Sequence, residues 1–367
     1  MIPWSRPDFH GNEEKYLKQA IRSSWISDGS FVKKFEKNFA KYLNKKDSVT
    51  VSNCTTAIHL IYLSLGLKRG DEIILPGFGY MAAANIAIQI GLIPKFADVD
   101  IDTFCVTAEN IKKVISKKTK LIVIIHTYGN VCDLKSIISL ANRISVPVLE
   151  DCAESLGSKY NNKETGTFGN FATFSFQATK TITTGEGGMI VTNKGKAFLN
   201  KLRSIKSHGV IKKRYYHMYP GHNFRLTNLQ AAIGCAQLKK FPKIKKERKR
   251  IYSIYQKLFK NLEGVKLQKF KSIVAPVVWT FALVIDEKIF PKRDQIIEIL
   301  KKRGIETRNG FFSPCRLPIY NKFKTSHLLN SNFLSKRIIC LPFFTSLKNN
   351  QIRYIYSEFN KLKKNSN

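Results

Sequence analysis

The 367-residue sequence is poor in acidic side chains: 26 aspartates and glutamates stand against 62 lysines and arginines, for a formal net charge of +36. Such a charge attracts polyanions and anionic small molecules. Long apolar runs are also missing, since the longest, 81–93, contains two amides and falls short of the ~18 residues of a membrane span. The first eight residues lack the pattern of a signal peptide, so we expect a cytoplasmic protein with no membrane partner.

Paired cysteines and Cys/His clusters are absent as well. The seven cysteines are scattered and form no CxxC pair. This argues against a zinc site and against a disulfide framework. We therefore expect reduced, semi-buried thiols and no metal.

The densest basic segment covers residues 239–250 and reads KKFPKIKKERKR. Its charges are interrupted by apolar residues at helix-like intervals. No zinc finger, RNP-type aromatic motif or recognition-helix unit accompanies it. A solvated helix face is favoured and no nucleic acid partner is expected, while a non-catalytic nucleic-acid-binding regulator is kept as an alternative.

Short apolar runs alternate with helix-like segments between residues 47 and 195. We expect strands at 48–52, 72–75, 95–98, 121–125, 147–150, 172–175 and 189–192. Apolar residues at three-to-four spacing predict helices at 55–65, 81–91, 109–116 and 133–143. This alternation predicts an α/β fold around a mostly parallel seven-stranded sheet.

The second half of the chain looks different. A helical region begins at Leu229, is expected to break at Pro242, and resumes over 243–262. The remainder reads as a smaller α+β unit, with a strand at 278–284 and helices at 293–303 and 350–362. We place the boundary near residue 245, giving a large domain of residues 1–245 with the N-terminal segment and a small domain of residues 246–367.

Lys180 is the one lysine whose surroundings indicate chemistry. It lies in a threonine-rich turn, and the glycine-rich turn 185–188 follows before an apolar strand. Upstream, the apolar run 148–151 ends in Asp151. A lysine that forms a Schiff base and an aspartate that pairs with a pyridinium nitrogen are the minimal requirements of pyridoxal 5'-phosphate (PLP) chemistry. A surface lysine and a turn-capping aspartate are the alternatives.

The start of the helix expected at 55–65 could bind the phosphate of PLP. Free amides and the positive end of the helix dipole meet there, and Thr55 and Thr56 add hydroxyls. Ser175, at a strand end, could reach the same place. A plain N-cap is the alternative for the two threonines.

Tyr80 could cover the face of the cofactor ring, and Phe78 is the competing choice. Asn53, Asp151 and Ser175 all lie at or just beyond strand ends. In parallel sheets ligands collect at the carboxyl ends of the strands, so these stretches can converge on one crevice.

With these residues in place, the sequence resembles the DegT/StrS-type sugar-nucleotide aminotransferases, a group of fold-type I PLP enzymes, over nearly its whole length. The matching segments are 25–29, 70–76, 150–154, 166–169, 174–180, 184–188, 221–228, 231–234, 304–308 and 340–342. The resemblance implies a homodimer with active sites shared between subunits.

The resemblance also implies roles for individual residues. Lys180 would bind the cofactor covalently and act in catalysis with Asp151, which would hold the ring nitrogen. Glu154 would lie near the phenolic oxygen. The other implied roles are phosphate binding by Thr55, Thr56 and Ser175 with Asn223 of the neighbouring subunit, ring stacking by Tyr80, and substrate binding by Ser27, Arg225 and Arg308.

Four positions depart from the family pattern. Cys54 and Thr56 stand where the family often has Gly and Ala, and Gln177 and Arg316 stand where many relatives have other residues, often His. A dehydratase branch replaces the Schiff-base lysine with histidine, so Lys180 favours transamination.

Within the family, the chain is most similar to perosamine-synthase-like enzymes. That similarity predicts transfer of an amino group from glutamate to C4 of a 4-keto-6-deoxyhexose on a nucleoside diphosphate, for surface-polysaccharide (O-antigen) synthesis. A C3 aminotransferase and a PLP-dependent sugar dehydratase are the alternatives.

Overall fold

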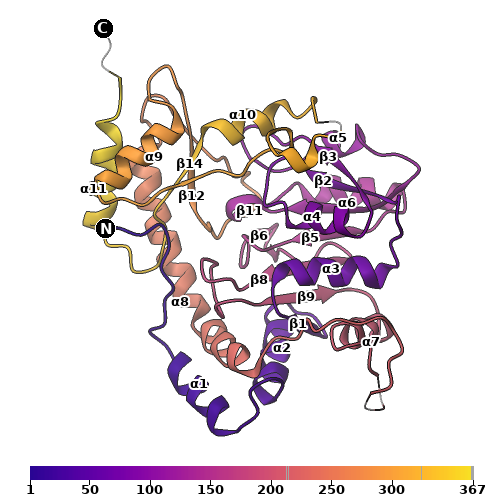
Figure 1. Ribbon diagram of the computed structural model, residues 1–367. Helices are drawn as coiled ribbons and strands as arrows, with labels where there is room; N and C mark the ends of the chain where they lie inside the picture. Colours follow the sequence, from indigo (N-terminus) through magenta and orange to yellow (C-terminus); the bar gives the residue numbers. More distant parts are fainter. Residues whose placement is uncertain (212, 214, 324, 365–367) are drawn as a thin grey trace.

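The structure, a computed structural model, describes residues 1–211, 213, 215–323 and 325–364. A seven-stranded sheet lies at its centre in the order β1-β9-β8-β5-β4-β2-β3 (Figure 1). The strands are β1 (Ser48–Val51), β2 (Glu72–Pro76), β3 (Ile93–Ala97), β4 (Thr119–Ile125), β5 (Val148–Asp151), β8 (Phe171–Ser175) and β9 (Gly188–Thr192). β9 runs in the direction opposite to the other six strands, which are parallel to one another. The predicted α/β fold with a mostly parallel sheet is therefore confirmed.

Helices cover both faces of this sheet. One face packs against α3 (Cys54–Leu65), α4 (Ala82–Gln89) and α7 (Lys196–Ile205). The other packs against α5 (Ala108–Lys112) and α6 (Leu134–Arg143), and at β8 and β9 against α2 (Ser30–Tyr42). In β2, Ile73 and Leu75 face the first layer and Ile74 the second, as the two-residue repeat of a doubly covered strand requires.

The long helix α8 (Asn228–Phe259) corrects one expectation, because it passes through Pro242 without a break. Pro242 is exposed, while its neighbour Phe241 and the nearby Ile244 are buried, so packing on both sides of the proline holds the helix together. Another expected helix, 109–116, is shorter than predicted. It ends at Lys112, and Val114 and Ile115 pack against the core from a turn.

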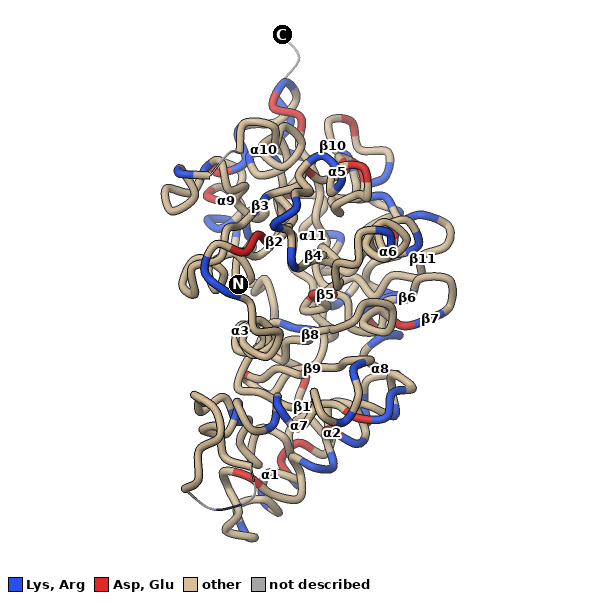
Figure 2. The backbone as a smooth tube through the Cα atoms, turned by 90° about the vertical axis from the view of Figure 1, so that its right-hand side faces the viewer, with Lys and Arg blue, Asp and Glu red and all other residues tan. Residues whose placement is uncertain are grey.

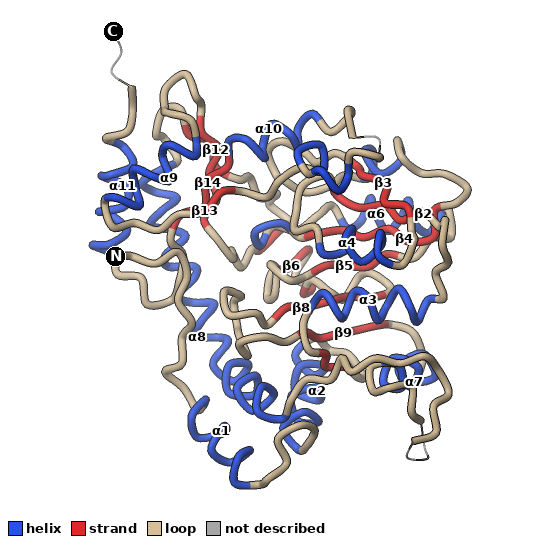
Figure 3. Tube along the Cα trace, in the orientation of Figure 1, coloured by secondary structure: helices blue, strands red, loops and turns tan. Residues whose placement is uncertain are grey.

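A smaller unit lies at the far end of α8 (Figure 3). Its antiparallel sheet has the order β10-β12-β14-β13, formed by β10 (Val265–Leu267), β12 (Phe281–Ile285), β14 (Ile338–Leu341) and β13 (Arg308–Asn309). Its helices are α9 (Arg293–Lys302), α10 (Leu329–Arg337) and α11 (Asn349–Asn360). A third sheet joins β11 (Val274–Ala275), β6 (Lys159–Tyr160) and β7 (Lys163–Glu164). The boundary near residue 245 stays a prediction, and this residue lies within α8.

The first residues cross to the smaller unit before the chain turns into α1 (Glu13–Arg22). The Ile2 N–H donates to the Gly304 carbonyl at 2.7 Å, and the Glu306 N–H donates to the Ile2 carbonyl at 2.9 Å. Trp4 follows, with its N–H on the Glu306 carboxylate at 3.0 Å. No helix among the described residues combines the length and the apolar character that crossing a bilayer demands.

Candidate active site

A cavity of about 750 Å³ opens at the carboxyl ends of the central strands. Asp151 ends β5, Ser175 ends β8, and Asn53 caps α3 just after β1. All three line the cavity, so the stretches that were expected to converge do so. The cavity also contains Lys180, together with Thr55, Thr56, Tyr80, Glu154 and Gln177.

Asp151 presents a buried carboxylate with spare acceptor capacity. Its Oδ1 accepts the Ala153 N–H at 3.0 Å and lies 4.0 Å from the Cys54 thiol. Within the described residues, Oδ2 accepts no hydrogen bond. Burial raises the pKa of Asp151, and the Ala153 amide and the charge of Lys180 oppose that rise. A cation or an N–H donor in the cavity would satisfy this oxygen.

Lys180 lies between an acid and an indole ring. Its Nζ is 3.8 Å from Oε1 of Glu154 and 3.8 Å from the centre of the Trp279 ring. The Trp279 N–H donates to the Thr179 carbonyl at 2.8 Å, which fixes the indole beside the lysine. Burial raises the pKa of Glu154 to about 7, against the opposing charge of Lys180. The carboxyl of Glu154 and the face of the Trp279 ring therefore both stabilise the positive charge of the Lys180 amine.

The start of α3 offers donors to an anion. Asn53 Oδ1 accepts the Thr56 N–H at 2.9 Å, and the Thr56 hydroxyl donates to the Asn53 carbonyl at 2.8 Å. Asn53 is therefore the N-cap, and Thr56 completes a capping box from inside the helix, so neither threonine is the N-cap that was considered. In the described part of the chain, the amides of Cys54 and Thr55 and the Thr55 hydroxyl have no partner. A helix N-terminus with free amides in a cavity suits a phosphate.

Aromatic side chains form one wall of the cavity. Tyr80 lines the cavity, whereas Phe78 is buried in the core against Tyr128 and Phe104. Of these two candidate rings, only Tyr80 can therefore contact a ligand ring. The sequence reasoning missed three further lining residues, which come from the smaller unit and the N-terminal segment: Trp4, Trp279 and Phe311. No local pattern marks them, because their place depends on how distant segments pack.

Four predicted residues lie outside this cavity. Asn223 and Ser27 are exposed, and Arg225 donates to the Asn223 side chain at 3.0 Å while lining a separate hollow. Arg308 pairs with Glu306 and lies over the ring of Trp4, at the cavity's edge. The role predicted for Asn223 requires a neighbouring subunit, and all four predicted roles stay predictions. Of the departures, Gln177 accepts from Thr179 within the cavity, and Arg316 contacts Ser335 and Phe312 outside it.

Comparison with known proteins gives this geometry a context. The model of the DegT/DnrJ/EryC1/StrS aminotransferase family matches residues 7–360.

The chain belongs to this family.

Three relatives show how far the similarity of this family member extends. It is 39% identical over 361 residues to the GDP-perosamine synthase of Vibrio cholerae, covering 97% of each chain. Helicobacter pylori PseC, an aminotransferase involved in pseudoaminic acid biosynthesis, is 28% identical with a TM-score of 0.93 over 98% of both chains. The E. coli GDP-4-keto-6-deoxy-D-mannose-3-dehydratase, solved with bound hydrated PLP, is 27% identical with a TM-score of 0.91, covering 98% of this chain and 99% of its own.

This sugar aminotransferase therefore has the fold-type I architecture and depends on PLP, as predicted. The residues present fit that cofactor. Asp151 has an unused acceptor for a ring nitrogen, the start of α3 has unused amides for a phosphate, and Lys180 supplies a primary amine between them. The individual residue roles remain predictions.

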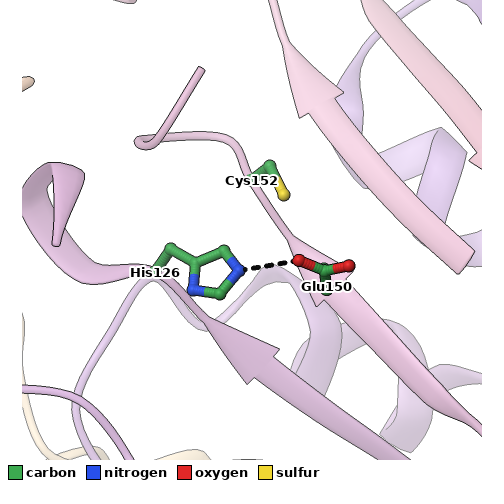
Figure 4. A group of neighbouring side chains, drawn as sticks. All are labelled: His126, Glu150 and Cys152. Carbon is green, nitrogen blue, oxygen red and sulfur yellow. Dashed lines mark hydrogen bonds and ion pairs between the residues drawn. The ribbon is translucent and has the colours of Figure 1, made fainter. Parts of the chain in front are cut away.

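A second group of titratable side chains, His126, Glu150 and Cys152, is buried at the ends of β4 and β5 (Figure 4). No metal-binding motif was predicted at these positions, and hydrogen bonds hold His126 and Glu150 in place. The Glu150 carboxylate accepts His126 Nε2 at 3.1 Å and three backbone N–H groups, and His126 Nδ1 accepts the Cys132 N–H at 3.2 Å.

The pKa shifts around Glu150 agree with a structural role for this group. Burial opposes ionisation of Glu150, but the hydrogen bonds outweigh it and lower the carboxyl pKa. Burial also raises the pKa of Cys152 well above its usual range, which keeps it a thiol. The network therefore ties β5 to residues 166–169, which precede β8, and to the turn that follows β4.

Proposed function

We propose that this enzyme transfers the amino group of glutamate to the C4 keto group of a 4-keto-6-deoxyhexose carried on a nucleoside diphosphate. One observation carries the proposal: the 39% identity to a GDP-perosamine synthase extends over 97% of both chains. Lys180 in the cavity supports transamination over the dehydratase chemistry of the family. The pathway proposed for the product is surface-polysaccharide synthesis.

The chemistry divides between cofactor and protein. When bound, PLP supplies an aldehyde that carries the amino group and a ring that withdraws electrons from the bond being broken. Lys180 Nζ takes the proton from the α-carbon of glutamate and returns a proton to the sugar carbon that receives the amine. With PLP bound, Asp151 would hold the ring nitrogen and favour its protonated form, and Glu154, with a pKa of about 7, can exchange a proton near neutral pH.

We further propose that the active form is a homodimer with shared sites. Asn223 and Ser27 are exposed and lie away from the cavity of their own chain. Large apolar side chains stand exposed in the neighbouring segments: Trp25, Ile26, Tyr216 and Met218. Exposed apolar surface of this kind is typical of an interface. A second subunit would cover these side chains and bring Asn223 to the partner's phosphate site.

A cytoplasmic location is proposed as well. All seven cysteines are free thiols, and five of them are buried. Unpaired thiols in this number are typical of a reducing compartment.

A substrate panel tests the reaction. The enzyme is incubated with PLP, glutamate and either a 4-keto or a 3-keto 6-deoxyhexose nucleotide, and the products are identified by mass and NMR. We expect an amine at C4 and release of 2-oxoglutarate. Amination only at C3, or loss of a hydroxyl without amination, would replace the proposal with one of the alternative family activities.

The role of Lys180 has a separate test. Borohydride reduction of the loaded enzyme followed by peptide mapping should place the cofactor on Lys180. Lys180→Ala should lose both half-reactions while circular dichroism shows an intact fold. A label on another lysine, or near wild-type turnover by the variant, would contradict the assignment.

A further inference from the structure

The densest basic segment of the sequence is not used by the active site. It forms the middle of α8, where this helix runs beside α2 (Figure 2). The two helices and Tyr16 of α1 enclose a second cavity of about 470 Å³. Its lining shares no residue with the cavity around Lys180.

Flat apolar side chains line the inside of this α2–α8 cavity. Tyr42 and Phe241 meet edge to face, with ring centres 5.5 Å apart and planes at 75°. Tyr16 and Leu238 add further apolar surface, and Pro242 exposes its ring there. Phe241 is itself buried, so the partly exposed rings of Tyr16 and Tyr42 form the surface that can accept a planar ring by stacking.

Four lysines surround this apolar surface. Lys34 and Lys41 come from α2, and Lys239 and Lys245 come from α8. Among the described residues, none of the four makes an ion pair or a hydrogen bond. The Lys34 and Lys245 ammonium groups instead lie 5.3 Å from the Tyr16 ring centre and 5.0 Å from that of Phe241.

No carboxylate lines this cavity to neutralise the lysines. Glu164 lies outside the lining: it adjoins Tyr42, pairs with Lys159 at 3.6 Å, and its charge also acts on Lys245. Four like charges around one opening repel each other, and an anion placed among them would remove that repulsion.

We propose that the α2–α8 cavity binds a nucleoside phosphate at a site separate from the PLP cavity. The base would stack on the aromatic surface, and the lysines would hold the phosphates. The volume lies within the range of small-molecule pockets. Because the cavity is small and its lining comes from α2, α8 and Tyr16 alone, a single nucleotide fits the observations better than a nucleic acid strand.

A matched pair of double variants tests the proposal on the PLP-loaded enzyme. Lys41→Glu with Lys239→Glu removes two lysines of the cavity. Lys243→Glu with Lys249→Glu makes the same charge change at exposed positions of α8 that do not line it. GDP, ADP and inorganic pyrophosphate are titrated by calorimetry, and aminotransferase activity is measured alongside to confirm folding.

We expect nucleotide binding to weaken by roughly tenfold or more in the cavity variant and to stay within about threefold in the control, since each lost lysine–phosphate contact is charge-assisted. Activity should be unchanged in both. Photolabelling with an 8-azido nucleotide should mark peptides that contain Tyr16, Tyr42 or Phe241.

Several outcomes would overturn the proposal. Equal loss of binding in both variants would show that only general charge attracts the nucleotide. Labelling confined to peptides around Lys180 would place the nucleotide in the PLP cavity alone. Pyrophosphate binding as tightly as GDP would remove the aromatic surface from the site, and tighter binding of a single-stranded oligonucleotide would assign the groove to nucleic acid.

Discussion

Glu154 offers a prediction whose size follows from its surroundings. Its side chain is buried, and the Tyr128 N–H donates to it at 2.8 Å. Burial raises its pKa from 4.5 to about 7. As the pH rises through this interval, the carboxyl ionises in the unfolded chain before it ionises in the folded protein. The folded state therefore loses stability with rising pH, and the loss is complete above the folded pKa.

The gap between the two pKa values corresponds to roughly 3 kcal/mol of unfolding free energy at most. Glu154→Gln keeps an acceptor for the Tyr128 N–H but cannot ionise. Relative to the wild type, the cofactor-free variant should gain up to this amount between about pH 5 and pH 8.

The assay is urea unfolding of both cofactor-free proteins across that pH range. Glu298→Gln serves as the control, because Glu298 is exposed and makes no ion pair among the described residues; its effect should not change with pH. A constant difference between Glu154→Gln and the wild type would refute the reasoning, since it would mean that the carboxyl ionises alike in both states.

Three further predictions follow from the structure. Asp151→Asn should lower turnover at least about tenfold by weakening ring protonation while PLP still binds, as measured by steady-state kinetics and cofactor absorbance; an unchanged rate would remove Asp151 from the mechanism. Phe39→Ala should cost about 3–5 kcal/mol in chemical unfolding, because the ring is fully buried against Phe174 and Phe176. Mixing inactive Lys180→Ala subunits with inactive Asn223→Ala subunits should restore activity in hybrid dimers, and no recovery after proven subunit exchange would argue against shared sites.

The central sheet was predictable because its information is local. Each strand is a short apolar run, and the first four are followed by segments with helical periodicity; all seven strands appear within two residues of their expected ends. The same logic placed Asp151 and Ser175 at the edge where the cavity opens. Pro242 misled the prediction because the local cost of a proline was outweighed by tertiary packing along α8.

The rest of the site depends on long-range packing. Trp279 reaches Lys180 only because β12 and its preceding loop fold back on the large unit, and nothing near Trp279 in the sequence indicates this. The choice between Tyr80 and Phe78 likewise required knowing which ring is buried. The group of His126 and Glu150 joins the ends of adjacent strands, so residue spacing could not reveal it.

The path of the first four residues has a practical consequence. Trp4 meets Trp279 edge to face at 5.6 Å, so residues 1–4 support the indole beside Lys180. Clipping these residues during purification would remove that support together with the hydrogen bonds of Ile2. A preparation could thus lose turnover with every catalytic group intact, and intact-mass measurement of each batch would detect the damage.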